Sequence, residues 1–153
     1  MIAEFDELEQ SEKELMYSLP IYVAVLIAGA DGKIDSNELK KAVSISGLKT
    51  TKARKELIEY YSIVNTDYED KLKMAIANLP SGTREREKLL IEEISKANDI
   101  LPKLESSFAV KLYASLKEIA KHIAEASGGV FGYMSVGYEE SKLIELKMLK
   151  KPA

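Results

Sequence analysis

The sequence predicts an all-α domain, a compact bundle of about seven or eight helices. Apolar residues recur every three or four positions along most of the chain, which is the spacing of one buried helix face. No stretch alternates apolar and polar residues over the length of a strand. Helix-capping residues, prolines and glycines divide the periodic stretches without long linkers, so we expect a single domain over residues 1–153.

The first long helix is expected to start at Ser11, because Ser11 and Glu14 have the spacing of a capping box. Pro20 lies inside this stretch and is expected to kink or restart the helix, since proline lacks the backbone N–H. The predicted apolar face repeats every three or four residues. It consists of Leu15, Leu19, Tyr22, Val23, Leu26 and Ile27.

Two further helices are predicted in the next third of the chain. One covers residues 36–45, after an acidic turn, and Gly47 ends it. The other is capped by Thr50 or Thr51, buries an apolar face and stops at Asn65.

The second half of the chain continues in the same way. Thr66 and Glu69 form another capping box, whose helix closes before Pro80. The next helix follows a short loop at residues 81–83 and extends to about Ile100, before Pro102.

The last long helix is predicted over residues 108–127, where a pair of glycines ends it. Residues 128–137 form the longest irregular segment, and residues 138–150 are predicted to form a short final helix.

The acidic turn at residues 28–38 is the most informative stretch for function. Asp31 lies where the first long helix stops, and Asp35 with Glu38 has the spacing of a capping box. A carboxylate at a helix C-terminus faces the negative end of the macrodipole. The negative charge of Asp31 is therefore expected to be offset by a bound cation, by Lys33 or by solvent.

Calcium and magnesium prefer carboxylate and carbonyl oxygens, which Asp31, Asp35 and Glu38 could present together with the turn carbonyls. The alternative is that Asp35 and Glu38 only cap the following helix and need no metal. An EF-hand is excluded by spacing, because its loop needs an oxygen ligand third, glycine sixth and glutamate twelfth. Counted from Asp31, those positions hold Lys33, Ser36 and Ala42.

The two ends of the chain echo each other. Residues 28–32 (Ala-Gly-Ala-Asp-Gly) correspond to residues 124–128 (Ala-Glu-Ala-Ser-Gly), and residues 34–38 correspond to 136–140 if an insertion is allowed. We therefore expect a pseudo-repeat of two helix–turn–helix units. Serine and glycine replace the two aspartates in the second unit, whereas a glutamate is kept.

At these residues the sequence resembles the TerB-like family, which is named for a tellurite-resistance protein and is also represented in some membrane-anchored J-domain co-chaperones. The resemblance covers nearly the whole chain and rests on residues 30–35 with Glu38, and on residues 126–129 followed by Glu139 and Glu140. It implies an all-helical fold with a pseudo-repeat, a role in bacterial stress response and metal binding through the acidic turns. It implies no established enzymatic activity.

The candidate metal ligands come from both units: Asp31, Asp35, Glu38 and Glu140. Because the second unit lacks the aspartates, one shared calcium or magnesium site, or none, is expected in place of two equivalent sites. The apolar side chains of the loop at residues 128–137 could instead hold a partner protein or tuck back over the core. The candidate partner-binding residues are Phe131, Tyr133 and Met134.

Composition excludes several other classes of function. The chain has no cysteine, so disulfides, thiolate metal sites and cysteine nucleophiles are absent. A formal charge of −3 argues against general nucleic-acid binding. His122 is the only histidine and is expected at the surface, and the tyrosines at positions 60, 61 and 68 are expected at the edge of the core.

Neither export nor membrane insertion is expected. The N-terminal residues are acidic, unlike those of a signal peptide, so a cytoplasmic location is predicted. The most apolar run, residues 19–30, is shorter than the ~20 residues needed to cross a bilayer.

We therefore expect a non-enzymatic intracellular module that binds a divalent cation weakly, a partner protein, or both, at the acidic corner. One alternative is a pure protein-interaction scaffold whose carboxylates only cap helices. Another is a carboxylate-dependent hydrolase, which would need two convergent acids, one of them buried.

Overall fold

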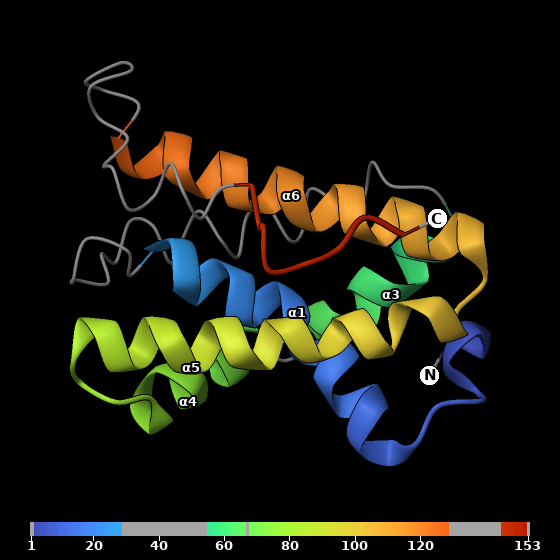
Figure 1. Cartoon of the computed structure of the whole chain (residues 1–153), viewed down its shortest axis with the longest axis horizontal. Helices are drawn as coiled ribbons and strands as arrows, with labels where there is room; N and C mark the ends of the chain where they lie inside the picture. Colours follow the sequence, from blue (N-terminus) through green and yellow to red (C-terminus); the bar gives the residue numbers. More distant parts are fainter. Residues whose placement is uncertain (1, 29–54, 67, 129–144, 153) are drawn as a thin grey trace.

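The computed structural model describes residues 2–28, 55–66, 68–128 and 145–152, and within these residues all regular structure is helical (Figure 1). The all-α prediction is thereby confirmed. The described residues form five α-helices, fewer than the seven or eight expected for the chain, and three short 3-10 helices. The α-helices are α1 (Gln10–Ala28), α3 (Lys55–Asn65), α4 (Tyr68–Asn78), α5 (Thr83–Ser95) and α6 (Ser106–Gly128); the 3-10 helices are η1 (Ala3–Phe5), η2 (Lys96–Asp99) and η3 (Leu101–Lys103). The predicted helix at residues 36–45 lies outside the described residues.

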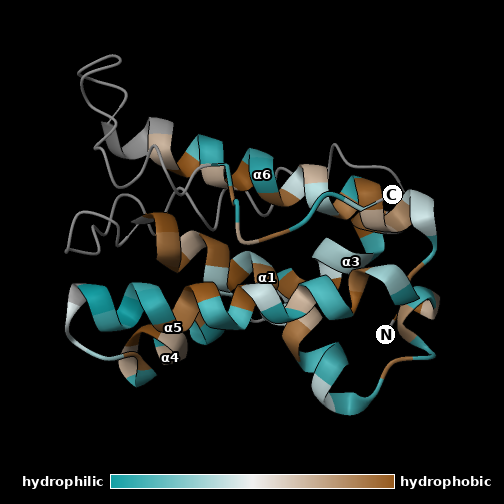
Figure 2. Cartoon of the chain, in the orientation of Figure 1, coloured by the Kyte–Doolittle hydropathy of each residue, from teal (hydrophilic) through white to brown (hydrophobic). Residues whose placement is uncertain are grey.

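Helix α1 is the centre of the bundle. It lies between α6 on one side and α5 on the other, and it also contacts α3 and α4 (Figure 1). The last turns of α1 are hydrophobic on nearly every side (Figure 2), and residues 23–27 are all buried. A helix that is apolar around its whole circumference is stable only when neighbours enclose it, which explains its central position. Among the described helices, none has the length and apolarity to cross a membrane.

Helices α1 and α6 run in the same direction and pack side by side, and both end at the same end of the molecule (Figure 1). The predicted apolar face of the last long helix is buried against this core, as expected. It includes Leu112, Leu116, Ile119, Ala120, Ile123 and Ala124.

An aromatic cluster fills the end of the core that lies nearer the N-terminus. Tyr17 and Tyr60 stack with ring centroids 5.8 Å apart, and Phe5 and Phe108 meet Tyr60 edge-on. The tyrosines at positions 60, 61 and 68 are all buried, so they belong to the core itself. Such ring pairs add about 0.5–1.5 kcal/mol each beyond the area they bury.

Of the two expected effects of Pro20, a kink or a restart of the helix, the restart does not occur, because α1 is continuous from Gln10 to Ala28. Proline cannot donate to the carbonyl four residues earlier, so the carbonyl of Met16 has lost its helical partner. The buried hydroxyl of Tyr60 in α3 donates a hydrogen bond to this oxygen. A side chain 44 positions away in sequence therefore satisfies the acceptor that the proline leaves open.

The helix caps differ from the predicted ones. Helix α1 starts at Gln10, and the Glu12 carboxylate accepts from the Glu9 backbone N–H at 2.9 Å, so the capping box begins two residues before Ser11. Thr66 does not open α4 in the expected way, since its hydroxyl donates to the Ser62 carbonyl at the end of α3 (3.0 Å). Asn65 ends α3 as predicted.

Glu105 caps α6 with both carboxylate oxygens, which accept from the backbone N–H groups of Ser107 (3.2 Å) and Phe108 (3.0 Å). Replacing Glu105 by alanine is expected to lower the free energy of unfolding by about 0.5–2 kcal/mol, because two N-terminal donors of the helix lose their acceptor. Urea unfolding measures this change. Glu92→Ala, which removes an exposed carboxylate within α5, is the matched control and should change stability by less than about 0.5 kcal/mol. Equal losses in the two variants would contradict the capping role.

The predicted final helix at residues 138–150 is wrong over its described part, because residues 145–148 form a turn. The side-chain amide of Asn98 donates to the Met148 carbonyl (2.8 Å), and the Lys150 N–H donates to the Asn98 side-chain oxygen (2.7 Å). Asn98 thus supplies hydrogen bonds that a helix would have made internally. The turn buries Leu146 and Leu149 in the core, and Leu146 adopts a positive φ of 47°.

Candidate functional site

All seven residues nominated from the sequence lie outside the described residues. They are the metal candidates Asp31, Asp35, Glu38 and Glu140 and the partner-binding candidates Phe131, Tyr133 and Met134. The structure does place the helices that lead into them, since α1 ends at Ala28 and α6 ends at Gly128. These two helix ends lie at the same end of the molecule (Figure 1).

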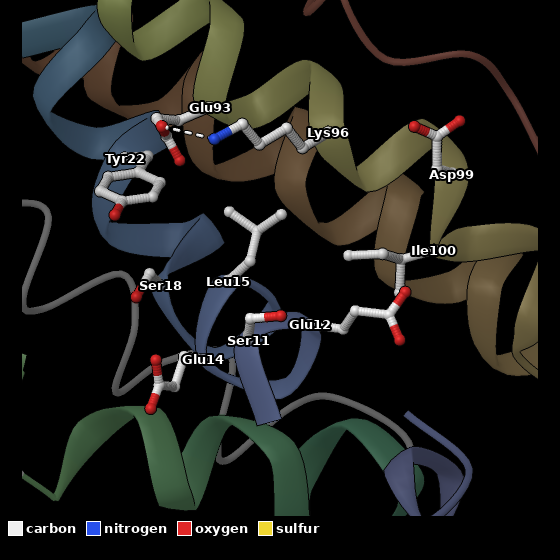
Figure 3. Close-up of a pocket in the computed structure, with 10 residues that line it drawn as sticks. All are labelled: Ser11, Glu12, Glu14, Leu15, Ser18, Tyr22, Glu93, Lys96, Asp99 and Ile100. Carbon is white, nitrogen blue, oxygen red and sulfur yellow. Dashed lines mark hydrogen bonds and ion pairs between the residues drawn. The ribbon is translucent and has the colours of Figure 1, made fainter. Parts of the chain in front are cut away.

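A groove that the sequence did not predict lies between α1 and the junction of α5 with η2 (Figure 3). Its volume is about 540 Å³, which is within the range of about 300–1,000 Å³ usual for ligand pockets. Leu15 and Ile100 face each other across its floor, and Tyr22 lies at one end. We call this cavity the α1/α5 groove.

Two helical stripes build the α1/α5 groove. Along α1 the lining residues recur at helical spacing, and they are Ser11, Leu15, Ser18 and Tyr22. Glu93 of α5, Lys96 of η2 and Ile100, which follows η2, form the facing stripe with the same period. The sequence prediction placed Leu15 and Tyr22 on the core face, whereas the structure leaves both only partly buried. Ser11 and Ser18 on the same stripe were the indication in the sequence that this face borders solvent.

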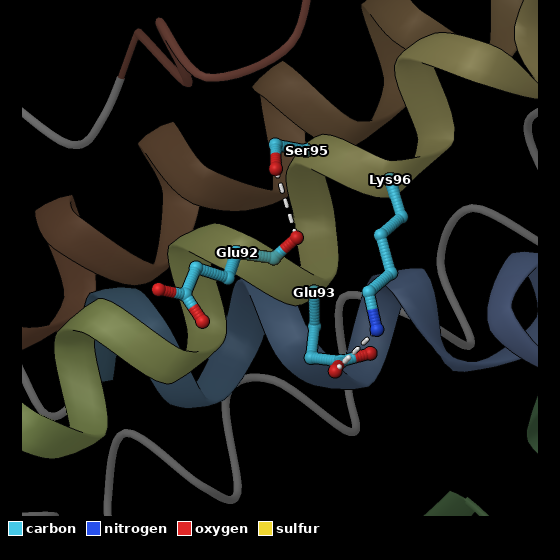
Figure 4. Close-up of polar contacts among 4 residues, drawn as sticks. All are labelled: Glu92, Glu93, Ser95 and Lys96. Atoms are coloured by element: carbon cyan, nitrogen blue, oxygen red, sulfur yellow. Dashed lines mark hydrogen bonds and ion pairs between the residues drawn. The ribbon is translucent and has the colours of Figure 1, made fainter.

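The end of α5 fixes the position of the second stripe (Figure 4). The Ser95 hydroxyl donates to the Glu92 carbonyl at 2.8 Å, which satisfies one acceptor where the α-helix stops. The backbone then continues as the 3-10 helix η2 from Lys96 to Asp99. Ile100 follows η2 directly and lines the floor of the α1/α5 groove.

Four carboxylates and one ammonium group line the α1/α5 groove: those of Glu12, Glu14, Glu93, Asp99 and Lys96. Lys96 Nζ binds Glu93 at 2.8 Å, and Lys103 Nζ, from η3, binds Glu12 at 2.7 Å. The groove is therefore acidic even after these two ion pairs are counted.

The ion pairs set the protonation of the groove. The hydrogen bond from Lys103, together with the Glu9 N–H, lowers the pKa of Glu12 below its usual range. The Glu93 carboxylate raises the pKa of Lys96, and Glu12 does the same to the pKa of Lys103. These groups stay charged at neutral pH, which suits charge recognition and not proton donation by the carboxyl group of Glu12.

The described acids do not assemble into a metal centre. Within residues 2–28, 55–66, 68–128 and 145–152, no three histidine or acidic side chains are placed to hold an ion. His122 is exposed on α6, as expected. The calcium or magnesium ligands predicted from the sequence belong to the segments after α1 and α6, so that metal site stays a prediction.

Comparison with known proteins finds no matching family model, no similar curated protein and no similar solved structure.

Proposed function

We propose that the protein is a non-enzymatic binding module of the TerB-like kind, which acts in a stress response and binds a divalent cation weakly, a partner protein, or both. The ligands would bind to the two segments that follow α1 and α6. The observation that supports this most is the parallel packing of α1 and α6, whose C-terminal ends lie at the same end of the molecule. Such packing would let residues that follow the two helix ends contribute to one site.

The proposed pseudo-repeat falls at these two helix ends. The first echoed stretch, residues 28–32, begins at the last residue of α1, whereas the second, residues 124–128, forms the last residues of α6. Two helix–turn–helix units related by duplication would place their turns in equivalent positions. One acidic turn and one partly acidic turn would then share a cation.

A carboxylate-dependent hydrolase is less well supported. General acid catalysis needs a carboxyl group whose pKa is raised by burial. Among the described acids, Glu12 has its pKa lowered by Lys103, the opposite of this requirement, and the acids nominated for such a hydrolase lie outside the described residues.

Titration with magnesium or calcium, followed by amide NMR shifts, tests the metal half of this proposal. We expect millimolar ion to shift resonances in the segments after Ala28 and Gly128, and Asp31→Asn or Glu140→Gln to weaken binding. Asp70→Asn, on the exposed side of α4, is the matched control and should bind the ion as the unchanged protein does. Absence of shifts at millimolar ion would refute metal binding.

The partner half is tested separately with an immobilised protein and a cell extract. Capture of the same partner with and without chelator, combined with its loss in Phe131→Ser, would favour a pure interaction scaffold. Val110→Ser provides the control, because Val110 is an exposed apolar residue at the other end of α6. Equal loss of capture in both variants would contradict a specific role for the loop at residues 128–137.

A further inference from the structure

The exposed side of α1 forms a ridge with a groove on each flank. The α1/α5 groove lies on one flank, and a second groove of about 420 Å³ lies between α1 and α4. Glu14, Ser18 and Tyr22 line both grooves, so the two cavities belong to one continuous surface. We call this surface the α1 ridge. The second groove also includes Ile21, Met74 and Ala75.

Apolar side chains are accessible on both flanks of the α1 ridge. Met74 is 64% exposed, the largest value for a large hydrophobic residue in the described chain. Leu15 and Tyr22 are only partly covered. A partner that covers apolar surface gains about 25 cal/mol per Å² removed from water, and methionine adapts its shape to such contacts.

Most of the charged residues that line the α1 ridge are acidic. They are Glu12, Glu14, Glu93 and Asp99, against Lys96 in the α1/α5 groove and Lys71 in the second groove. Lys96 and Lys103 are already engaged by Glu93 and Glu12. Among the described residues, Glu14 and Asp99 have no ion pair. Exposed ion pairs contribute only about 0–1 kcal/mol, so a stronger cation can displace either lysine.

We propose that the α1 ridge is a docking surface for a basic amphipathic helix of another protein. The leucine-like side chains of that helix would lie on Leu15 and Tyr22, with a further apolar contact at Met74. Its arginines or lysines would face Glu14, Glu93 and Asp99. Charge complementarity identifies this class of partner, because an acidic rim around an apolar floor repels anionic segments and matches a helix with a cationic border.

The length of the surface fits a short helix. The lining stripe of α1 runs from Ser11 to Tyr22, which corresponds to about 16 Å along the helix axis. Three turns of a partner helix, about 11 residues, span the same length. The α1 ridge contains none of the residues proposed above to hold a cation or a partner, so the proposal does not depend on the function proposed above.

The test uses a fluorescein-labelled synthetic peptide of three helical turns, with leucines on one face and arginines along its edges. Fluorescence anisotropy should show saturable binding to the full chain that weakens as salt is added. NMR should place the shifts in residues 11–22 and 93–100, away from those expected for a divalent cation. Asp99→Lys is expected to weaken binding by about tenfold, since it replaces attraction by repulsion.

Two matched variants separate docking from general electrostatics. Glu118→Lys makes the same charge change on an exposed position of α6 and should leave the affinity within about twofold. Met74→Ser should weaken binding by several-fold, whereas Ile58→Ser, at an exposed position of α3, should not. The proposal is overturned if Asp99→Lys and Glu118→Lys act alike, or if a scrambled peptide of equal charge binds equally well. Self-association of the chain through these same residues would also overturn it, because a second copy would then be the occupant.

Discussion

Replacing Tyr60 by phenylalanine is expected to lower the free energy of unfolding by about 1–3 kcal/mol, although the substitution removes a single oxygen atom. The lost hydroxyl donates to the carbonyl of Met16, which has no helical donor because Pro20 follows four residues later. The phenylalanine variant leaves a buried acceptor without a partner. Urea or thermal unfolding measures the loss.

A double-mutant cycle with Pro20→Ala tests this explanation. Alanine restores a backbone N–H that can donate to Met16, so Tyr60→Phe should cost less than half as much in the Pro20→Ala background. The coupling should be about 1 kcal/mol. Tyr113→Phe, at a partly exposed position of α6, is the control and should be nearly neutral in both backgrounds. Equal costs of Tyr60→Phe in the two backgrounds would show that its hydroxyl does not compensate for the proline.

Alkaline pH is expected to unfold the protein steeply. Burial raises the pKa values of Tyr60, Tyr61 and Tyr68 above that of an exposed tyrosine. Above pH of about 10, these side chains lose their protons in the unfolded chain but keep them in the folded chain. The unfolded state then binds fewer protons, so stability is unaffected below that pH and falls as pH rises further.

The expected size of this effect is large. Each buried tyrosine removes up to about 1.4 kcal/mol per pH unit, and the three together remove up to about 4 kcal/mol per unit. Since small domains are stable by only about 5–15 kcal/mol, unfolding should follow within one to a few pH units. Tyrosinate absorbance and helical circular dichroism should change together. A full rise in tyrosinate absorbance without loss of helix would contradict the buried state of these side chains.

Tyr61→Phe distinguishes this linkage from general alkaline damage. The Tyr61 hydroxyl lies 2.7 Å from the Ser115 hydroxyl, which itself donates to the Leu112 carbonyl, so Tyr61 is the donor in their contact. Without this hydroxyl, the free energy of unfolding should fall about one third less steeply with pH above about 10. The variant should also lose a smaller amount of this free energy at neutral pH, because the hydrogen bond is lost. Tyr113→Phe, which removes the hydroxyl of a partly exposed tyrosine, again serves as the control.

Local patterns in the sequence predicted much of the fold. Apolar spacing located α6 and its buried face, and Asn65 ended α3 as expected. The errors came from contacts between distant residues. Pro20 would break an isolated helix, but Tyr60 satisfies the acceptor that it leaves open. The final segment has helical spacing at Leu146 and Leu149, yet Asn98 holds it as a turn.

The candidate site was harder to predict from the sequence, because it too depends on contacts between residues that are distant in the sequence. Periodicity assigned Leu15 and Tyr22 to a buried face because it detects where apolar residues recur along a helix. It does not detect how closely the neighbouring helix packs against them. The α1/α5 groove forms where α1 faces the end of α5 and η2, which lie far from α1 in the sequence, so no local pattern predicts it. The acidic turn at residues 28–38 and the loop at residues 128–137 lie outside the described residues, so their proposed roles await the titration and capture experiments.

The bond between Tyr60 and the Met16 carbonyl has a consequence for how the sequence can diverge. When another residue replaces the proline at position 20, its backbone N–H can donate to the Met16 carbonyl, and position 60 no longer needs a hydroxyl. A lineage that keeps the proline does not have that freedom. Positions 20 and 60 should therefore change together among descendants of this gene, and loss of the hydroxyl should arise only after loss of the proline.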